Sequence, residues 1–176
     1  MGLFKKIASA MGRSRGSMRI LVVGLDNSGK STLIEHIKPN KASTFEATPT
    51  VGFQVQEFAK NNLNFTVFDM SGQSRYRTLW EHYFCDVHAI IFVVDSTDRV
   101  RMCVAKEELE EVLRHNEASA TPGTQNVFVR IILAVGSHTG ASPSILAFFR
   151  GISRTSRFSR YKCMASSVEG YKATYR

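Results

Sequence analysis

The chain lacks the features that mark a secreted, zinc-bound or membrane-spanning protein. Among 176 residues it has four prolines and three widely spaced cysteines, with no C-x-x-C pair. An odd number of isolated cysteines favours neither a disulfide framework nor a zinc site, so we expect a reducing, cytoplasmic setting. No stretch approaches the roughly 18 consecutive apolar residues that a membrane-spanning helix needs. One compact globular domain is the expectation that remains.

An excess of charge of one sign is confined to the second part of the chain. The formal net charge is +8, yet residues 1–111 carry 14 Lys and Arg against 13 Asp and Glu, whereas residues 112–176 carry 9 against 2. A charge of +8 ordinarily suggests nucleic acid or anionic membrane as the partner. Because the basic excess belongs to the tail, we expect no nucleic-acid partner.

The first 16 residues are expected to form an amphipathic helix and a linker. Apolar side chains at helical spacing share one face, and they are Leu3, Phe4, Ile7, Ala8 and Met11. Lysines interrupt the apolar run, which argues against a secretory signal. N-myristoylation of Gly2 is disfavoured, since its motif requires Ser or Thr at position 6, where this chain has Lys6. We therefore expect an unmodified helix that lies on a membrane surface.

Residues 17–135 show alternating strand and helix patterns. Strands are expected at 19–23, 89–94 and 127–135, and helices at 30–37 and 100–113. Apolar alternation on both sides of Asn61-Asn62 predicts an antiparallel hairpin. The expected fold is therefore α/β, with a mostly parallel sheet and one antiparallel hairpin. Residues 136–176 lose this order, and we expect a divergent, weakly structured basic tail there.

A glycine-rich segment after the first strand has the spacing of a phosphate-binding loop. It fits G-x-x-x-x-G-K-[ST], the P-loop. Because it lies between a strand and a helix, its backbone N–H groups and the helix N-terminus can stabilise phosphate charge. Lys30 is expected to reach the β- and γ-phosphates, and the Ser31 hydroxyl to bind Mg²⁺. The candidate nucleotide-binding residues here are Gly24, Leu25, Asp26, Asn27, Ser28, Gly29, Lys30, Ser31 and Thr32.

Two further segments supply candidates for metal binding and catalysis. Asp69 ends the second hairpin strand and begins D-x-x-G, which is followed by Gln73. A carboxylate at this point can hold Mg²⁺ through water, and Gln73 can orient an attacking water. Thr50 lies in the loop before the hairpin, where its hydroxyl can complete the Mg²⁺ shell when a γ-phosphate is present. The candidate metal site is Ser31, Thr50 and Asp69, and the candidate catalytic residue is Gln73.

Together, these segments resemble a small GTPase of the Arf-like family. The matching stretches, within residues 18–113, are GLDNSGKST, PTVGF, FTVFDMSGQSRYRTLWEHYF and AIIFVVDSTDRVRMCVAKEELEEVL. The family generally has glycine at the position of Ser71, and in having serine there this chain resembles a ciliary member. The resemblance implies a P-loop small-GTPase fold, GTP or GDP bound with Mg²⁺, a γ-phosphate contact from the Gly72 N–H, and Thr50 as the switch threonine.

The resemblance also implies partners and a location. It implies a switch that recruits effectors to membranes, with a ciliary coat complex as effector, and with an exchange factor and a GTPase-activating protein. The location implied is the cilium or basal body, as a peripheral membrane protein. GTP hydrolysis is expected to be slow without a partner, because the sequence places no obvious arginine to stabilise transition-state charge.

The family's guanine-reading motif, N-K-x-D, is absent. After the strand expected to end at Val135 the chain continues with Gly136-Ser137-His138-Thr139-Gly140, which offers no carboxylate. Two explanations stay open. The tail is the product of an altered reading frame, retained intron or alternative exon joined near residues 113–126, or the chain is a divergent GTPase with a different base site. The C-terminal part of the fold is expected to be incomplete or divergent either way.

Three functions follow from this division of the chain. The phosphate and magnesium half favours a GTP-binding switch, while the missing motif allows a nucleotide-deficient interaction module or an ATP-using P-loop enzyme. Trp80, Tyr83 and Phe84 follow Gln73. In an α/β domain such aromatic residues are about as often part of the core. The resemblance places them in the second switch, which favours an exposed patch that binds a partner.

Overall fold

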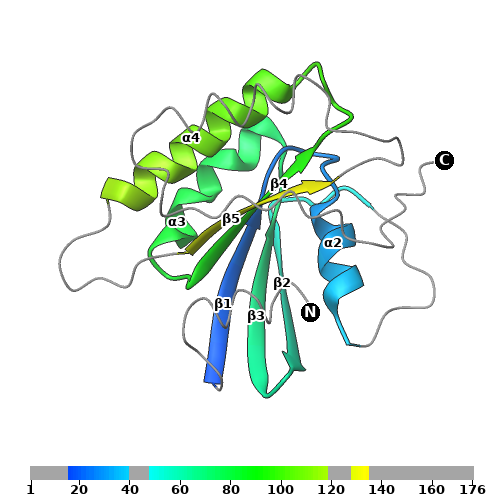
Figure 1. The fold of residues 1–176 in the computed structure, drawn as a ribbon, viewed down its shortest axis with the longest axis vertical. Helices are drawn as coiled ribbons and strands as arrows, with labels where there is room; N and C mark the ends of the chain where they lie inside the picture. Colours follow the sequence, from blue (N-terminus) through cyan, green and yellow to red (C-terminus); the bar gives the residue numbers. More distant parts are fainter. Residues whose placement is uncertain (1–15, 40–47, 119–127, 135–176) are drawn as a thin grey trace.

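The computed structural model describes residues 16–39, 48–118 and 128–134. Within them, five strands form one sheet in the order β2-β3-β1-β4-β5 (Figure 1). Only the β2–β3 pair is antiparallel. The elements are β1 (Gly16–Val23), α2 (Lys30–Ile37), β2 (Phe53–Lys60), β3 (Leu63–Met70), η1 (Ser74–Leu79), α3 (Glu81–Phe84), β4 (Ala89–Asp95), α4 (Met102–Ala118) and β5 (Phe128–Ala134). The α/β fold predicted from the sequence is confirmed.

Helices cover both faces of this sheet, which explains the continuous apolar runs of its central strands. Leu21 and Val23 of β1 pack in a cluster beneath α3 and α4, whereas Ile20 and Val22 pack on the opposite face with α2. Figure 1 shows α3 and α4 on one side of the sheet and α2 on the other. A parallel strand buried on both faces has no polar side to alternate with.

The hairpin turn follows from two asparagines. Asn61 and Asn62 have φ angles of 55° and 61°, the left-handed pair that a two-residue type I′ turn needs and that asparagine tolerates. The turn joins Lys60 to Leu63, which are paired across β2 and β3. The predicted hairpin is therefore confirmed at both strands and at the turn.

The edge strand β2 and the residues just before it leave apolar side chains in solvent. Val51, Phe53 and Val55 are 68%, 44% and 49% exposed, although their alternation with polar residues is typical of a half-buried strand. Alternation shows which side chains share a face, but only the packing of other elements decides whether that face is covered.

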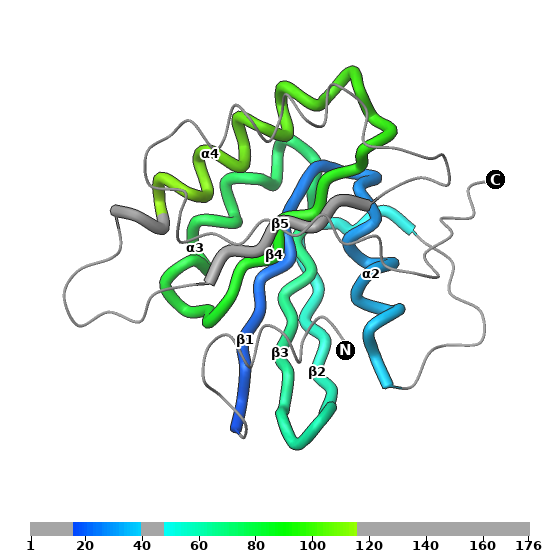
Figure 2. Tube along the Cα trace, in the orientation of Figure 1, coloured from blue at the N-terminus to red at the C-terminus, as the bar shows by residue number. Residues whose placement is uncertain are grey.

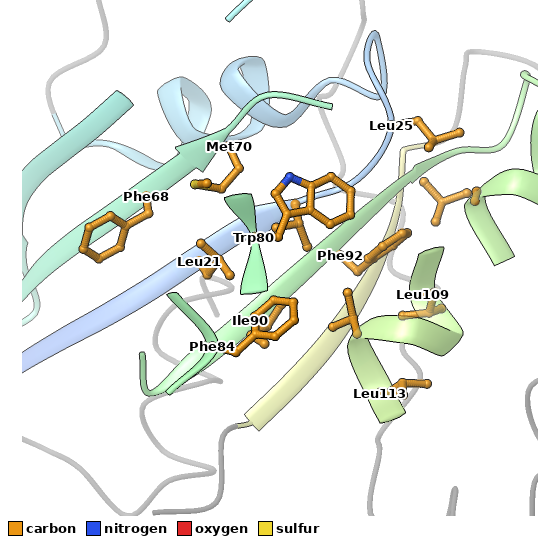
Figure 3. Close-up of a cluster of buried hydrophobic side chains, with 14 of the residues drawn as sticks. Leu21, Leu25, Phe68, Met70, Trp80, Phe84, Ile90, Phe92, Leu109 and Leu113 are labelled. Atoms are coloured by element: carbon orange, nitrogen blue, oxygen red, sulfur yellow. The ribbon is translucent and has the colours of Figure 1, made fainter. Parts of the chain in front are cut away.

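The expectation of an exposed patch at Trp80 and Phe84 is wrong. Trp80 and Phe84 are 2% and 3% exposed, and they pack with Phe92 and Leu109 in the cluster beneath α4 (Figure 3). The Trp80 indole N–H donates to the buried Ser71 carbonyl at 3.0 Å, which satisfies its polar edge inside the core. Tyr83 alone is half-buried, and its ring lies 5.5 Å from Phe53 and 5.1 Å from Phe68.

Two predicted segments fall outside the structural description. The helix expected at residues 2–11 and the tail from residue 136 belong to the ranges that the structure does not describe. Gly16, assigned to the linker from the sequence, instead begins β1. Among the described helices, none is both long enough and apolar enough to cross a membrane.

Candidate functional site

The P-loop connects the end of β1 to the start of α2, as the tube in Figure 2 shows. Gly24 has a φ of +138°, and a Cβ there would lie 2.2 Å from the Val93 carbonyl oxygen of β4, so the loop can pass the sheet only as glycine. Gly29 is left-handed and caps α2 without a side-chain hydrogen bond. The first N–H groups of α2 are therefore left to bind an anion.

Lys30 begins α2 and is almost entirely buried. Its side chain is 6% exposed, and Nζ donates to the Leu25 carbonyl oxygen at 2.7 Å. Burial lowers the pKa of Lys30 to about 8, while the carboxylates of Asp69 and Asp26 act in the opposite direction. A lysine held in this way carries a poorly solvated positive charge that an anionic ligand can neutralise.

Asp69 lies one residue before the end of β3, beside the P-loop, and is fully buried. Within the described residues, neither of its carboxylate oxygens has a hydrogen-bond partner. Burial raises the pKa of Asp69, while the Ser31 hydroxyl and the Lys30 ammonium oppose that rise. An unpaired buried carboxylate is costly in free energy unless a cation compensates it.

The hydroxyls of Ser31 and Thr50 meet next to this carboxylate. Ser31 Oγ and Thr50 Oγ1 are 3.2 Å apart, although the two residues come from different segments. No group of three or more His, Cys, Asp or Glu side chains in the described ranges could hold a metal ion. Two hydroxyls and a carboxylate are nevertheless hard oxygen donors, which fit Mg²⁺ held with phosphate and water.

Gly72 packs directly on the P-loop backbone. A Cβ at Gly72 would lie 2.2 Å from the Asp26 nitrogen and 2.2 Å from the Leu25 carbonyl carbon. The structure therefore brings Gly72 against the P-loop. Gln73 follows it, and the Gln73 Oε1 atom accepts a hydrogen bond from Arg75 Nε at 3.2 Å.

Two arginines that sequence reasoning missed surround the P-loop carboxylate of Asp26. Arg101 donates to Asp26 Oδ1 at 2.9 Å and to the Asp26 carbonyl at 3.1 Å. Arg77 Nη2 lies 3.8 Å from the same Oδ1. An acidic side chain within a phosphate-binding loop repels its ligand, and these guanidinium groups offset that charge. No sequence signal connects these residues, because 75 positions separate Asp26 from Arg101.

The geometry thus assembles the predicted candidates at one end of the sheet. The buried carboxylate of Asp69 lies near the Lys30 ammonium and the Ser31 hydroxyl. The Thr50 hydroxyl meets that of Ser31, and Gly72 contacts the P-loop backbone. Of the predicted site residues, Gln73 has its side chain engaged with Arg75 rather than with the P-loop.

Comparisons with known proteins identify related chains. The ADP-ribosylation factor family model matches residues 4–130. ADP-ribosylation factor-like protein 6 from Danio rerio is 53% identical over 115 residues, which are 65% of this chain and 62% of that protein. The Caenorhabditis elegans protein of the same name is 44% identical over 117 residues, or 66% and 62% of the two chains. This chain therefore spans less than two thirds of the length of these relatives.

Solved structures lead to the same family. The Arl6 BBS3 small GTPase from Trypanosoma brucei, solved with the nucleotide analogue GppNp, has a TM-score of 0.69 and 33% identity, and the match covers 85% of this chain and 84% of that one. The mammalian SRP receptor, with a TM-score of 0.54 and 18% identity over 65% of this chain and 60% of its own, shares the fold alone. This chain belongs to the ADP-ribosylation factor family of small GTPases.

Proposed function

We propose that this chain is a GTP-binding switch that binds GTP with Mg²⁺, recruits effectors to membranes and hydrolyses GTP slowly. The observation that carries this proposal is the fully buried Asp69 carboxylate, which has no hydrogen-bond partner in the described ranges. It lies beside a buried P-loop lysine and a pair of hydroxyls. A buried carboxylate without a hydrogen bond lowers the stability of the folded protein, and a bound cation would compensate its charge.

Each residue of the site has a distinct part in this proposal. The backbone N–H groups of residues 24–32 hold the phosphates, and Lys30 reaches the β- and γ-phosphates. Ser31 and Thr50 offer hydroxyl ligands to Mg²⁺, and Asp69 binds it through water. Held by these residues, Mg²⁺ would offset the negative charge of the phosphates. The contacts of the Thr50 hydroxyl and the Gly72 N–H form only when a γ-phosphate is present. GTP therefore orders their loops, and GDP releases them.

The effector surface in this proposal is the apolar strip formed by the start of the edge strand β2 and by Val51 just before it. Val51, Phe53 and Val55 are exposed, and Phe53 contacts Tyr83, so residues on both sides of the Gly72 segment contribute to one surface. An exposed apolar strip of this kind is typical of a protein–protein contact.

The similarity to proteins named ADP-ribosylation factor-like protein 6 and Arl6 BBS3 supports the more specific partners. They are a ciliary coat complex as effector, an exchange factor and a GTPase-activating protein. The same similarity supports a peripheral membrane location at the cilium or basal body, with the N-terminal helix on the membrane surface.

Hydrolysis in this proposal depends on Gln73, which orients the attacking water. The two arginines beside the P-loop are engaged with Asp26, Glu108 and the Gly72 carbonyl, so a partner must supply the charge that stabilises the transition state. Gln73→Leu should slow single-turnover GTP hydrolysis about tenfold or more and leave GTP affinity unchanged, because only water positioning is lost. Ser74→Ala, at the exposed neighbouring position, is the control. Equal rates in Gln73→Leu and the parent chain would exclude this role.

The lowered pKa of Lys30 predicts how nucleotide affinity depends on pH. Phosphate binding needs the ammonium form, whose population falls as pH rises through about 8. Affinity should therefore be nearly constant below that pH and fall about tenfold between pH 7 and pH 9. Titrations with GTP and Mg²⁺ at pH 7, 8 and 9 measure this slope. Lys30→Arg, which stays charged, should remove the slope, and a constant affinity in the parent chain would show that the Lys30 charge does not contribute.

A further inference from the structure

Arg77 connects three parts of the molecule through a single guanidinium group. It lies in η1, and its Nε donates to the Gly72 carbonyl oxygen at 2.8 Å. Its Nη1 donates to Glu108 Oε1 of α4 at 2.9 Å, and its Nη2 lies 3.8 Å from Asp26 Oδ1 of the P-loop. The side chain is only 15% exposed, so these contacts are poorly screened by solvent.

The peptide that Arg77 holds has one further hydrogen bond among the described residues, a long one from the Gln73 N–H to Ser71 Oγ at 3.4 Å. Gly72 lies outside every helix and strand, and glycine has the largest backbone freedom of any residue. The peptide before it is held by two bonds, from the Ser71 N–H to the Gly52 carbonyl at 2.9 Å and from the Trp80 indole to the Ser71 carbonyl at 3.0 Å. The peptide after it is held at its carbonyl by Arg77.

The N–H of Gly72 is the group that remains to bind a ligand. Gly72 is buried against the P-loop, and in the described part of the chain its N–H donates to no recorded acceptor. A donor held in place before the ligand arrives loses little entropy when it forms its hydrogen bond. In the proposed site this donor faces the γ-phosphate, a group that a diphosphate lacks.

We propose that Arg77 is a positioning residue that sets the preference of this site for a nucleoside triphosphate over a diphosphate, by holding Gly72 against the P-loop. This inference rests on the proposed function, since it concerns the same nucleotide site. Arg77 sets this preference through Gly72, whereas its 3.8 Å contact with Asp26 offsets a charge that the triphosphate and the diphosphate both meet. Glu108 of α4 anchors the guanidinium, so α4 contributes to nucleotide preference at a distance from the phosphates.

The test compares affinities for GppNp and GDP, each with Mg²⁺, in the full chain and its variants. Arg77→Ala should lower the ratio of GppNp to GDP affinity about tenfold, with GDP affinity nearly unchanged. Arg77→Lys should lower the ratio in the same direction, because an ammonium keeps the charge but cannot donate along all three directions of the planar fork. Glu108→Gln, which weakens the anchor and leaves the Gly72 contact, should lower it about threefold.

The control is Lys106→Gln on the same helix. Lys106 pairs with Glu110 at 3.5 Å on the partly exposed side of α4. Its replacement should leave the ratio of GppNp to GDP affinity unchanged. If Arg77→Ala fails to fold, Arg77→Lys and Glu108→Gln decide the question. An unchanged ratio in both, or an equal loss of GppNp and GDP affinity, would overturn the positioning role. A parent chain that binds neither nucleotide would instead overturn the proposed function.

Discussion

Replacing Lys30 with alanine is expected to abolish binding of a nucleoside triphosphate and to leave the secondary structure near normal. Lys30 is buried at the start of α2, where its ammonium can reach a phosphate anchored on the P-loop. Losing a charge-assisted contact of this kind should weaken binding about 100-fold or more. The fold should survive, because the Leu25 carbonyl that Lys30 contacts also accepts the Ser28 N–H at 3.3 Å.

An equilibrium titration with a GTP analogue and Mg²⁺, together with a far-ultraviolet circular dichroism spectrum, measures both parts of this expectation. Lys38→Ala is the matched control, since Lys38 caps the other end of α2 and pairs with Glu35 at 2.7 Å. Its affinity should equal that of the parent chain. Parent-like affinity in Lys30→Ala would contradict the assignment of residues 24–32 as a phosphate-binding loop.

The second large effect is the loss of discrimination between guanine and adenine. The chain after β5 offers no carboxylate at residues 136–140, where the family places its guanine-reading aspartate. A site that hydrogen-bonds a particular base rejects others by large factors, whereas a site that contacts only phosphate and ribose does not. GTP should therefore be preferred over ATP by less than about 1.4 kcal/mol, or tenfold. This chain should also bind GTP at least tenfold more weakly than a family member that carries N-K-x-D does.

Titrations with GTP and ATP under identical Mg²⁺ concentrations measure this preference directly. A family member that carries N-K-x-D serves as the reference and should discriminate strongly. A preference of this chain for GTP of hundredfold or more would show that another residue reads the base. The account of residues 136–176 as a divergent tail would then be wrong.

Local sequence signals predicted the elements that carry the site. The helix expected at residues 30–37 is α2, because glycine precedes it and Pro39 ends it. The hairpin was predictable because Asn61 and Asn62 suit the left-handed conformations that its turn requires. The P-loop was predictable because its glycines and lysine have a fixed spacing along the chain.

The parts that escaped prediction depend on residues distant in sequence. Arg101 reaches Asp26 only because β1 and β4 are adjacent in the sheet, which brings the P-loop to the start of α4. The same packing of α4 over the sheet buries Trp80. Val51, Phe53 and Val55 stay largely exposed at the edge of the sheet, where β2 has a neighbouring strand on one side only. Periodicity carries none of this information, since it reports only which side chains share a face.

The central claim, that this chain holds a nucleoside triphosphate and Mg²⁺ around Lys30 and Asp69, is tested most directly by the melting temperature of the full chain. A ligand that binds only the folded state raises the melting temperature by mass action. GTP with Mg²⁺ should raise it, and chelating the Mg²⁺ should remove most of that rise. A melting temperature that neither GTP nor ATP changes in the presence of Mg²⁺ would contradict the claim and favour a nucleotide-deficient interaction module.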